Sequence, residues 1–87
     1  MLPLVRAQLE AYLDGKITVG ELEGWVVGYT QPVISSGDKH ALELLNEIDS
    51  SLVERGEDLI DEGEFVATMT ALRLRFAPAR HPNVSRA

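Results

Sequence analysis

Apolar residues recur at steps of three and four positions in four stretches of the chain, which is the spacing of one face of an α-helix. We therefore expect helices over roughly residues 2–14, 18–29, 38–55 and 61–76. Each helix would turn its apolar face toward a shared core. The residues expected to face inward are Leu2, Val5, Leu9, Tyr12 and Leu13; Leu22, Trp25, Val26 and Tyr29; Ala41, Leu45, Ile48 and Leu52; and Phe65, Met69, Leu72 and Phe76.

Two of the expected helix starts carry the same capping device, at positions 43 residues apart. In each, a Thr or Asp side chain can accept from the free N–H groups of the first turn, and a Glu three residues later can reach back to the cap. Apolar residues before and after the cap can close over it as a hydrophobic staple. The two copies are Ile17, Thr18, Glu21 and Leu22, and Ile60, Asp61, Glu64 and Phe65. The repeat is explained either by gene duplication or by the likeness of any two capped helical hairpins.

Short turns separate the first expected helix from the second and the third from the fourth. Asp14-Gly15-Lys16 interrupts the first helical pattern, and Gly56 is a suitable residue just past the third helix. Residues 30–37 are expected to form the longest internal loop, which would link two hairpins. Short connections force neighbouring helices to run antiparallel. The sequence thus predicts an all-α fold of four short helices, arranged as two tandem antiparallel helical hairpins in one small bundle.

Length and composition limit the domain organisation. The chain has 87 residues and no cysteine, which leaves room for one domain with one modest core and excludes disulfides and thiolate metal sites. We expect a helical bundle domain over residues 1–77 and a flexible basic C-terminal tail over residues 78–87. No apolar run approaches the ~20 residues of a membrane span, and the N-terminus lacks the features of a signal peptide. These observations favour a cytoplasmic protein with no membrane partner.

Charge is distributed unevenly along the chain. The formal net charge is −6, yet all 14 acidic residues fall within residues 1–64, while residues 65–87 contain four arginines and no acid. Long-range repulsion between the acidic body and a phosphate backbone argues against binding to nucleic acid. A basic protein partner would be attracted instead. Solubility alone is the other explanation for the charge.

An acidic run over residues 54–64 contains six carboxylates in eleven positions. Three of them precede or open the fourth expected helix, where negative charge favours the positive end of the helix. Glu54, Glu57 and Asp58 have no such explanation. They are interpreted first as a solvated turn and second as a docking surface for a basic partner.

The second expected helix contains a row of glycines, Gly20, Gly24 and Gly28, at four-residue steps. Each glycine costs about 1 kcal/mol relative to alanine in a helix interior. The row would allow close approach of another helix, either the fourth helix of this chain or a helix of a second chain. Val27, Val33 and Ile34 lie off the expected core stripe and would extend such a contact. The alternative is a weak helix in which the glycines have no role.

Candidates for catalysis and metal binding are few. His40 shares a helix face with Glu43 and Glu47, but one histidine and two carboxylates leave a metal shell incomplete, and a solvated face explains them. His81 lies in the expected tail. The chain has no nucleophile elbow, no phosphate-binding loop and no dinucleotide fingerprint. We therefore expect no enzyme, no catalytic residue, no cofactor and no bound metal.

Residues 14–21 resemble the second half of an EF-hand calcium loop. Asp14, Gly15, Ile17 and Glu21 match the fifth, sixth, eighth and twelfth loop positions of that family. The first and third positions would be Glu10 and Tyr12, and the tyrosine supplies no carboxylate where calcium needs one. Calcium requires six to eight oxygen ligands, and this segment offers two or three. A degenerate EF-hand-like protein is therefore the least favoured interpretation.

Residues 9–23 also resemble the opening of small acidic immunity proteins of the colicin D type, and of short uncharacterised actinobacterial helical proteins. The shared pattern is Leu9-x-x-Tyr12-Leu13-x-Gly15-Lys16-Ile17-Thr18-x-x-Glu21-Leu22-Glu23. The matching positions form a turn and a capping box. The resemblance implies an acidic helical bundle that blocks a basic nuclease toxin, and it assigns no binding residue.

These observations favour a non-enzymatic protein-interaction module. The leading hypothesis is a small acidic binder or inhibitor of a basic protein, similar to an immunity protein or antitoxin. The alternative is a homodimeric structural or regulatory adaptor. The candidate partner-binding residues are Glu54, Glu57, Asp58, Gly20, Gly24 and Gly28.

Overall fold

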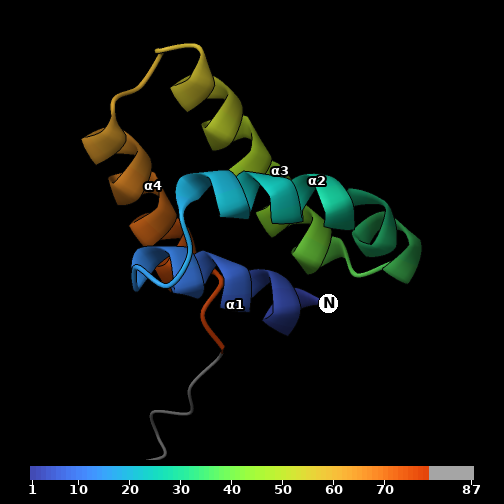
Figure 1. Ribbon diagram of the computed structural model, residues 1–87. Coiled ribbons are helices and arrows are strands. Elements are labelled where there is room, and N and C mark those ends of the chain that lie inside the picture. The colour runs from blue at the N-terminus through green and yellow to red at the C-terminus, as the bar shows by residue number, and fades with distance from the viewer. Residues whose placement is uncertain (79–87) are drawn as a thin grey trace, which may run out of the picture.

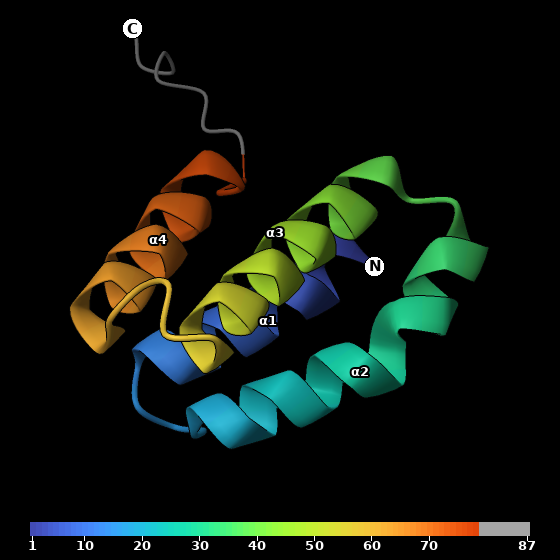
Figure 2. The same ribbon diagram turned by 90° about the horizontal axis from the view of Figure 1, so that it is seen from above.

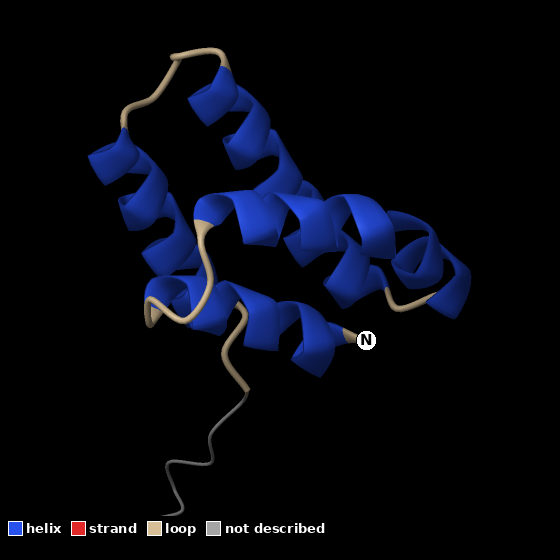
Figure 3. Ribbon diagram, in the orientation of Figure 1, coloured by secondary structure: helices blue, strands red, loops and turns tan. Residues whose placement is uncertain are grey.

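The computed structural model describes residues 1–78, and these residues form four helices and no strand (Figures 1 and 3). The helices are α1 (Leu2–Leu13), α2 (Val19–Ser36), α3 (Lys39–Gly56) and α4 (Glu62–Arg75). The predicted all-α fold of four helices is therefore confirmed. Most of the predicted tail lies outside the described residues.

In Figure 2 successive helices run in opposite directions, so α1 and α3 point the same way, although Figure 1 shows that they cross at an angle. Two hydrogen bonds hold the two ends of α1. At one end, the Leu2 N–H donates to Asp38 Oδ2 over 3.1 Å, and at the other, the Tyr12 hydroxyl donates to Glu62 Oε2 over 3.1 Å. The α1–α2 and α3–α4 turns consequently lie at the same end of the molecule, which we call the turn end (Figure 2). Helix α3 contacts each of the other three helices, whereas α2 and α4 do not contact each other.

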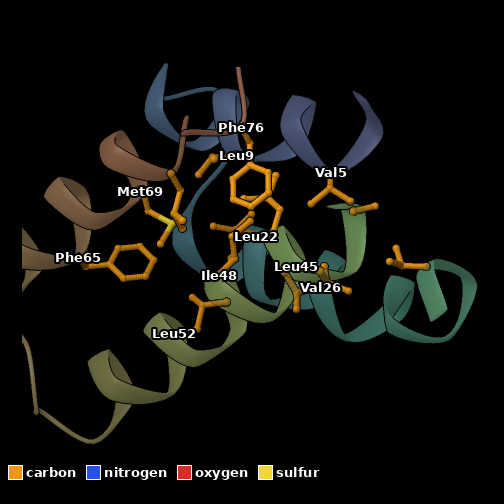
Figure 4. Packing of buried hydrophobic residues seen from close by; sticks show 14 residues of the cluster. Val5, Leu9, Leu22, Val26, Leu45, Ile48, Leu52, Phe65, Met69 and Phe76 are labelled. Carbon is orange, nitrogen blue, oxygen red and sulfur yellow. The ribbon is translucent and has the colours of Figure 1, made fainter. Parts of the chain in front are cut away.

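One hydrophobic core is built from all four helices (Figure 4). The inward faces predicted for α3 and α4 are confirmed, because every predicted residue on them is buried. On α1 and α2 only some of the residues predicted to face inward are buried. Tyr29 is exposed, and Trp25 is only partly buried. The sequence pattern missed Leu44 and Val33, which are both fully buried. The core residues are Val5, Leu9, Leu22, Val26, Val33, Ala41, Leu44, Leu45, Ile48, Leu52, Phe65, Met69, Leu72 and Phe76.

The loop predicted over residues 30–37 is wrong, because α2 continues through Pro32 to Ser36. Proline removes one backbone donor and crowds the carbonyl four residues earlier, so it usually ends or bends a helix. Here the next residue, Val33, is fully buried and extends the core stripe of α2 by one turn. Burial of a valine side chain is worth roughly 1.5–3 kcal/mol, which offsets much of the cost of the proline. The helix ends instead at Gly37, whose φ of 74° is the left-handed conformation that glycine adopts readily.

The two turns at the turn end have the same backbone hydrogen bonds, 43 residues apart. In the first, the Gly15 N–H donates to the Tyr12 carbonyl and the Lys16 N–H to the Ala11 carbonyl. In the second, the Asp58 N–H donates to the Arg55 carbonyl and the Leu59 N–H to the Glu54 carbonyl. This pattern closes a helix with one left-handed residue. The predicted capping boxes follow both turns and are complete, so the sequence repeat is also a repeat of structure.

The capping boxes should contribute measurably to stability. Thr18 Oγ1 accepts from the Glu21 N–H over 3.1 Å, and Asp61 Oδ1 accepts from the Glu64 N–H over 2.8 Å. We expect Thr18→Ala and Asp61→Ala each to lower the free energy of unfolding by about 1 kcal/mol, because first-turn donors lose their acceptor. Urea denaturation followed by circular dichroism measures the change. Ser50→Ala, at an exposed position inside α3, is the control, and equal midpoints for all three variants would contradict the role of the caps.

Candidate protein-interaction surfaces

The turn end concentrates the negative charge of the molecule. Two segments, residues 10–23 and 49–64, each contain one of these turns and the helix ends beside it. Together they contain eleven acidic residues and only two basic residues, Lys16 and Arg55. The remaining described residues contain three acidic and four basic residues. The fold therefore converts a charge asymmetry along the sequence into one between two ends of a bundle.

Several carboxylates at the turn end have structural partners. Glu21, Asp61 and Glu64 belong to the capping boxes. Glu62 accepts from Arg55 Nε over 2.7 Å through one oxygen and from the Tyr12 hydroxyl through the other. These hydrogen bonds explain the four carboxylates as parts of the fold.

Tyr12 and Arg55 also fix the position of the α3–α4 turn. The Tyr12 ring meets the Phe65 ring edge-on, with centroids 5.6 Å apart, and the Arg55 guanidinium lies 5.8 Å from the Phe65 centroid. Partial burial raises the pKa of Tyr12, and the hydrogen bond to Glu62 and the charge of that carboxylate raise it further. Helices α1, α3 and α4 are thus joined directly beneath the α3–α4 turn.

Glu54, Glu57 and Asp58 are exposed and make no side-chain hydrogen bond or ion pair with any described residue. We call these three residues the acidic turn. The structure places them together at the α3–α4 connection, as the sequence predicts. They lie at the C-terminal end of α3, where the helix itself presents unpaired carbonyl groups and negative charge is unfavourable. Helix capping therefore does not explain them.

Asp58 has a φ of 59° and occupies the left-handed position that closes α3. The equivalent position in the first turn is Gly15, with a φ of 77°. A residue other than glycine costs roughly 1 kcal/mol in this conformation, although aspartate tolerates it better than most. The prediction that Gly56 lies just past the end of α3 is wrong, because Gly56 is the last residue of the helix. The chain therefore carries a carboxylate at the turn position where glycine would be more stable.

Of the residues His40, Glu43 and Glu47, the two glutamates form ion pairs with an arginine. Arg75 of α4 donates through Nη2 to Glu43 Oε2 over 2.5 Å, and its Nη1 lies 3.6 Å from Glu47 Oε2. His40 is exposed in the first turn of α3. No group of three or more His, Cys, Asp or Glu residues in the described part of the chain is arranged to hold a metal ion. His81 lies outside the described residues.

The segment that resembles an EF-hand does not form a calcium loop. Such a loop would begin at Glu10, yet residues 10–13 belong to α1 and only a short turn precedes the Thr18 cap. Glu21 is engaged with the Thr18 N–H over 2.8 Å. The matching residues therefore serve a helix end and a helix start.

The glycine row of α2 lies on the side of the helix away from the core. A Cβ atom added at Gly24 or Gly28 would meet nothing within 4 Å, and one at Gly20 would meet only Thr18 Oγ1 at 3.8 Å. The alternative in which α4 packs closely on this row is wrong, because α2 and α4 do not contact each other. Val27 is 72% exposed and Ile34 is 49% exposed, whereas Val33 belongs to the core.

Nothing in the described residues resembles a small-molecule site. Residues 1–78 enclose no pocket, since the core side chains fill the space between the helices. No described helix is both long enough and apolar enough to cross a membrane. The candidate sites are thus two surfaces, the acidic turn and the outer face of α2.

Comparison of the chain with protein-family models, with curated proteins and with solved structures finds no match.

Proposed function

We propose that this protein is a non-enzymatic interaction module that docks onto a basic protein through its acidic turn, in the manner of an immunity protein or antitoxin. The observation that carries the proposal is the acidic turn. Glu54, Glu57 and Asp58 are exposed and unpaired among the described residues, and Asp58 holds its charge at a position that favours glycine. The absence of a pocket in the described residues and the resemblance of residues 9–23 to acidic immunity proteins agree with it.

Rigidity beneath the acidic turn supports the same proposal. The Tyr12–Glu62–Arg55 hydrogen bonds and the packing of Phe65 fix the α3–α4 turn against α1. A turn whose backbone is already ordered loses less conformational entropy on binding, so more of the electrostatic attraction appears as affinity. Such a surface also accelerates encounter with a cationic partner, and the acceleration falls with rising salt.

The experiment compares two variants with the same change in net charge. The first replaces the acidic turn (Glu54→Gln, Glu57→Gln, Asp58→Asn), and the control replaces three other carboxylates (Glu10→Gln, Glu23→Gln, Asp49→Asn). All six positions are exposed, so we expect changes in the free energy of unfolding of under ~0.5 kcal/mol for each substitution. Both variants and the wild type are used to capture proteins from a lysate of the source organism at low and moderate salt.

We expect the wild type and the control to capture the same basic protein, and the acidic-turn variant to lose most of it. Capture should weaken at moderate salt, because exposed charges are screened beyond about 10 Å at 0.1 M. Equal losses in both variants would show that net charge alone matters. Equal capture by all three proteins at both salts would reject the acidic turn as the docking surface.

A further inference from the structure

Helix α2 carries two rows of uncharged residues, and only one of them is packed. Leu22, Val26 and Val33 face the core and are buried. On the opposite side, a second row follows alternating steps of four and three residues, the spacing of a helix-packing seam. We call it the outer row, and it consists of Gly20, Gly24, Val27, Gln31 and Ile34.

The outer row is accompanied by an unusual absence of charge. From Gly24 to Gly37 the chain contains no acidic, basic or histidine residue, although most of this helix faces solvent in the isolated chain. The solvent face of a helix usually carries charged or polar residues, whereas here Val27 and Ile34 are exposed on it. A Cβ added at Gly24 would meet nothing within 4 Å, and one at Gly20 would meet only the Thr18 hydroxyl, so no packing within the described fold compensates for the cost of these glycines in the helix.

Charge indicates what covers the row. The described residues contain 14 acids and six bases, so most contacts between two copies would bring like charges together. Residues 24–37 carry no charge, so two copies can meet along the outer row without that cost. An antiparallel arrangement also places the two turn ends, which lie at the N-terminal end of α2, at opposite ends of the pair.

The shape of the row points to the same arrangement. Its N-terminal half contains Gly20 and Gly24, and its C-terminal half contains the larger Gln31 and Ile34, with Val27 between them. When two copies of α2 lie antiparallel, the glycine half of each faces the larger half of the other. This self-complementarity is what a twofold interface requires, and glycine lets the two backbones approach closely.

We propose that two copies of this protein associate through the outer rows of their α2 helices, packed antiparallel about a twofold axis near Val27. The interface uses a surface separate from the acidic turn, and it does not depend on the proposed partner.

The test is sedimentation velocity of the purified full-length chain from about 5 µM to about 1 mM, a range that covers weak to moderate association. The wild type should shift from the mass of one chain toward that of two. Val27→Glu places two like charges near the axis and should weaken the dimer at least about tenfold. Because Val27 is 72% exposed, its circular dichroism spectrum should remain that of the wild type.

Leu74→Glu is the matched control. Leu74 is 74% exposed on α4, where Gly63, Ala67, Thr70 and Leu74 form a shorter outer row between charged residues at both helix ends. We expect Leu74→Glu to dimerise like the wild type. A wild type that stays monomeric at about 1 mM, a Val27→Glu variant that still dimerises, or a loss caused by Leu74→Glu alone would each overturn the proposal.

A second variant separates association from folding. Glutamine is a better helix former than glycine, and a Cβ at Gly24 meets nothing in the isolated chain. Gly24→Gln should therefore raise the melting temperature of the dilute protein while it weakens the dimer at least about tenfold. Unchanged association together with higher thermal stability would show that the two helices do not approach at Gly24, which would also overturn the proposal.

Discussion

Replacement of Phe65 by alanine should lower the free energy of unfolding by about 3–5 kcal/mol, the range for large aromatic residues in protein cores. Phe65 is fully buried. Its ring meets Tyr12 of α1 and lies beneath the guanidinium of Arg55 from α3, so the substitution opens a cavity where three helices meet. Small domains are stable by only about 5–15 kcal/mol. The variant should therefore unfold at a much lower urea concentration than the wild type.

Leu74→Ala is the control for Phe65→Ala. Leu74 is a large apolar residue of the same helix, but it is exposed, and its truncation should change the free energy of unfolding by under ~0.5 kcal/mol. Both variants are measured by equilibrium urea denaturation followed by circular dichroism. A loss of less than about 1 kcal/mol for Phe65→Ala would mean that the core is not packed as described, since burial is what separates the two residues.

The double substitution Gly24→Ala and Gly28→Ala should raise the free energy of unfolding by about 2 kcal/mol, or about 1 kcal/mol for each glycine. Neither new methyl group meets another atom within 4 Å, so the gain in helix propensity is not offset by a clash. The measurement is made on dilute protein, at a concentration where sedimentation shows a single chain.

Gly15→Ala, measured in the same experiment, should lower the free energy of unfolding instead of raising it. Gly15 has a φ of 77°, a conformation that costs alanine roughly 1–2 kcal/mol. We therefore expect the double α2 variant to be more stable than the wild type and Gly15→Ala to be less stable. Destabilisation by the two α2 substitutions would show that the glycines pack against the chain itself, contrary to the described fold.

Much of the fold is predictable from local sequence signals that agree with one another. In α4, the Asp61 cap, the Glu64 partner and the apolar positions from Phe65 to Phe76 all indicate the same helix in the same orientation. In α3, Asp38 is a residue type that favours the N-cap, and together with a regular apolar face it gives similar agreement. The Ala41 N–H bond to Asp38, and further bonds from Leu2 and the N-terminus, lower the pKa of that carboxyl group.

Other features depend on contacts that sequence spacing does not contain. Pro32 indicates the end of a helix locally, and only the burial of Val33 shows why α2 continues beyond it. Glu43 and Arg75 are 32 positions apart, so their pairing could not be read from steps along one helix. Asp58 lacks the usual signature of a left-handed residue, since Gly56 nearby is the stronger local signal. The sequence alone shows the acidic residues of the acidic turn. That their side chains have no partner among the described residues is visible only in the folded structure.

The position of both turns at one end gives the protein a large electric dipole moment. Eleven acidic residues lie in the segments that flank those turns, while most of the described basic residues lie toward the other end. In the field of a cationic surface, such a molecule experiences a torque that directs its turn end forward within a Debye length, about 8 Å at physiological salt. In the antiparallel pair the two moments oppose and cancel, and two acidic ends face outward. The pair would then present two equivalent docking ends, so that a partner with two basic sites at the right spacing would be held by avidity.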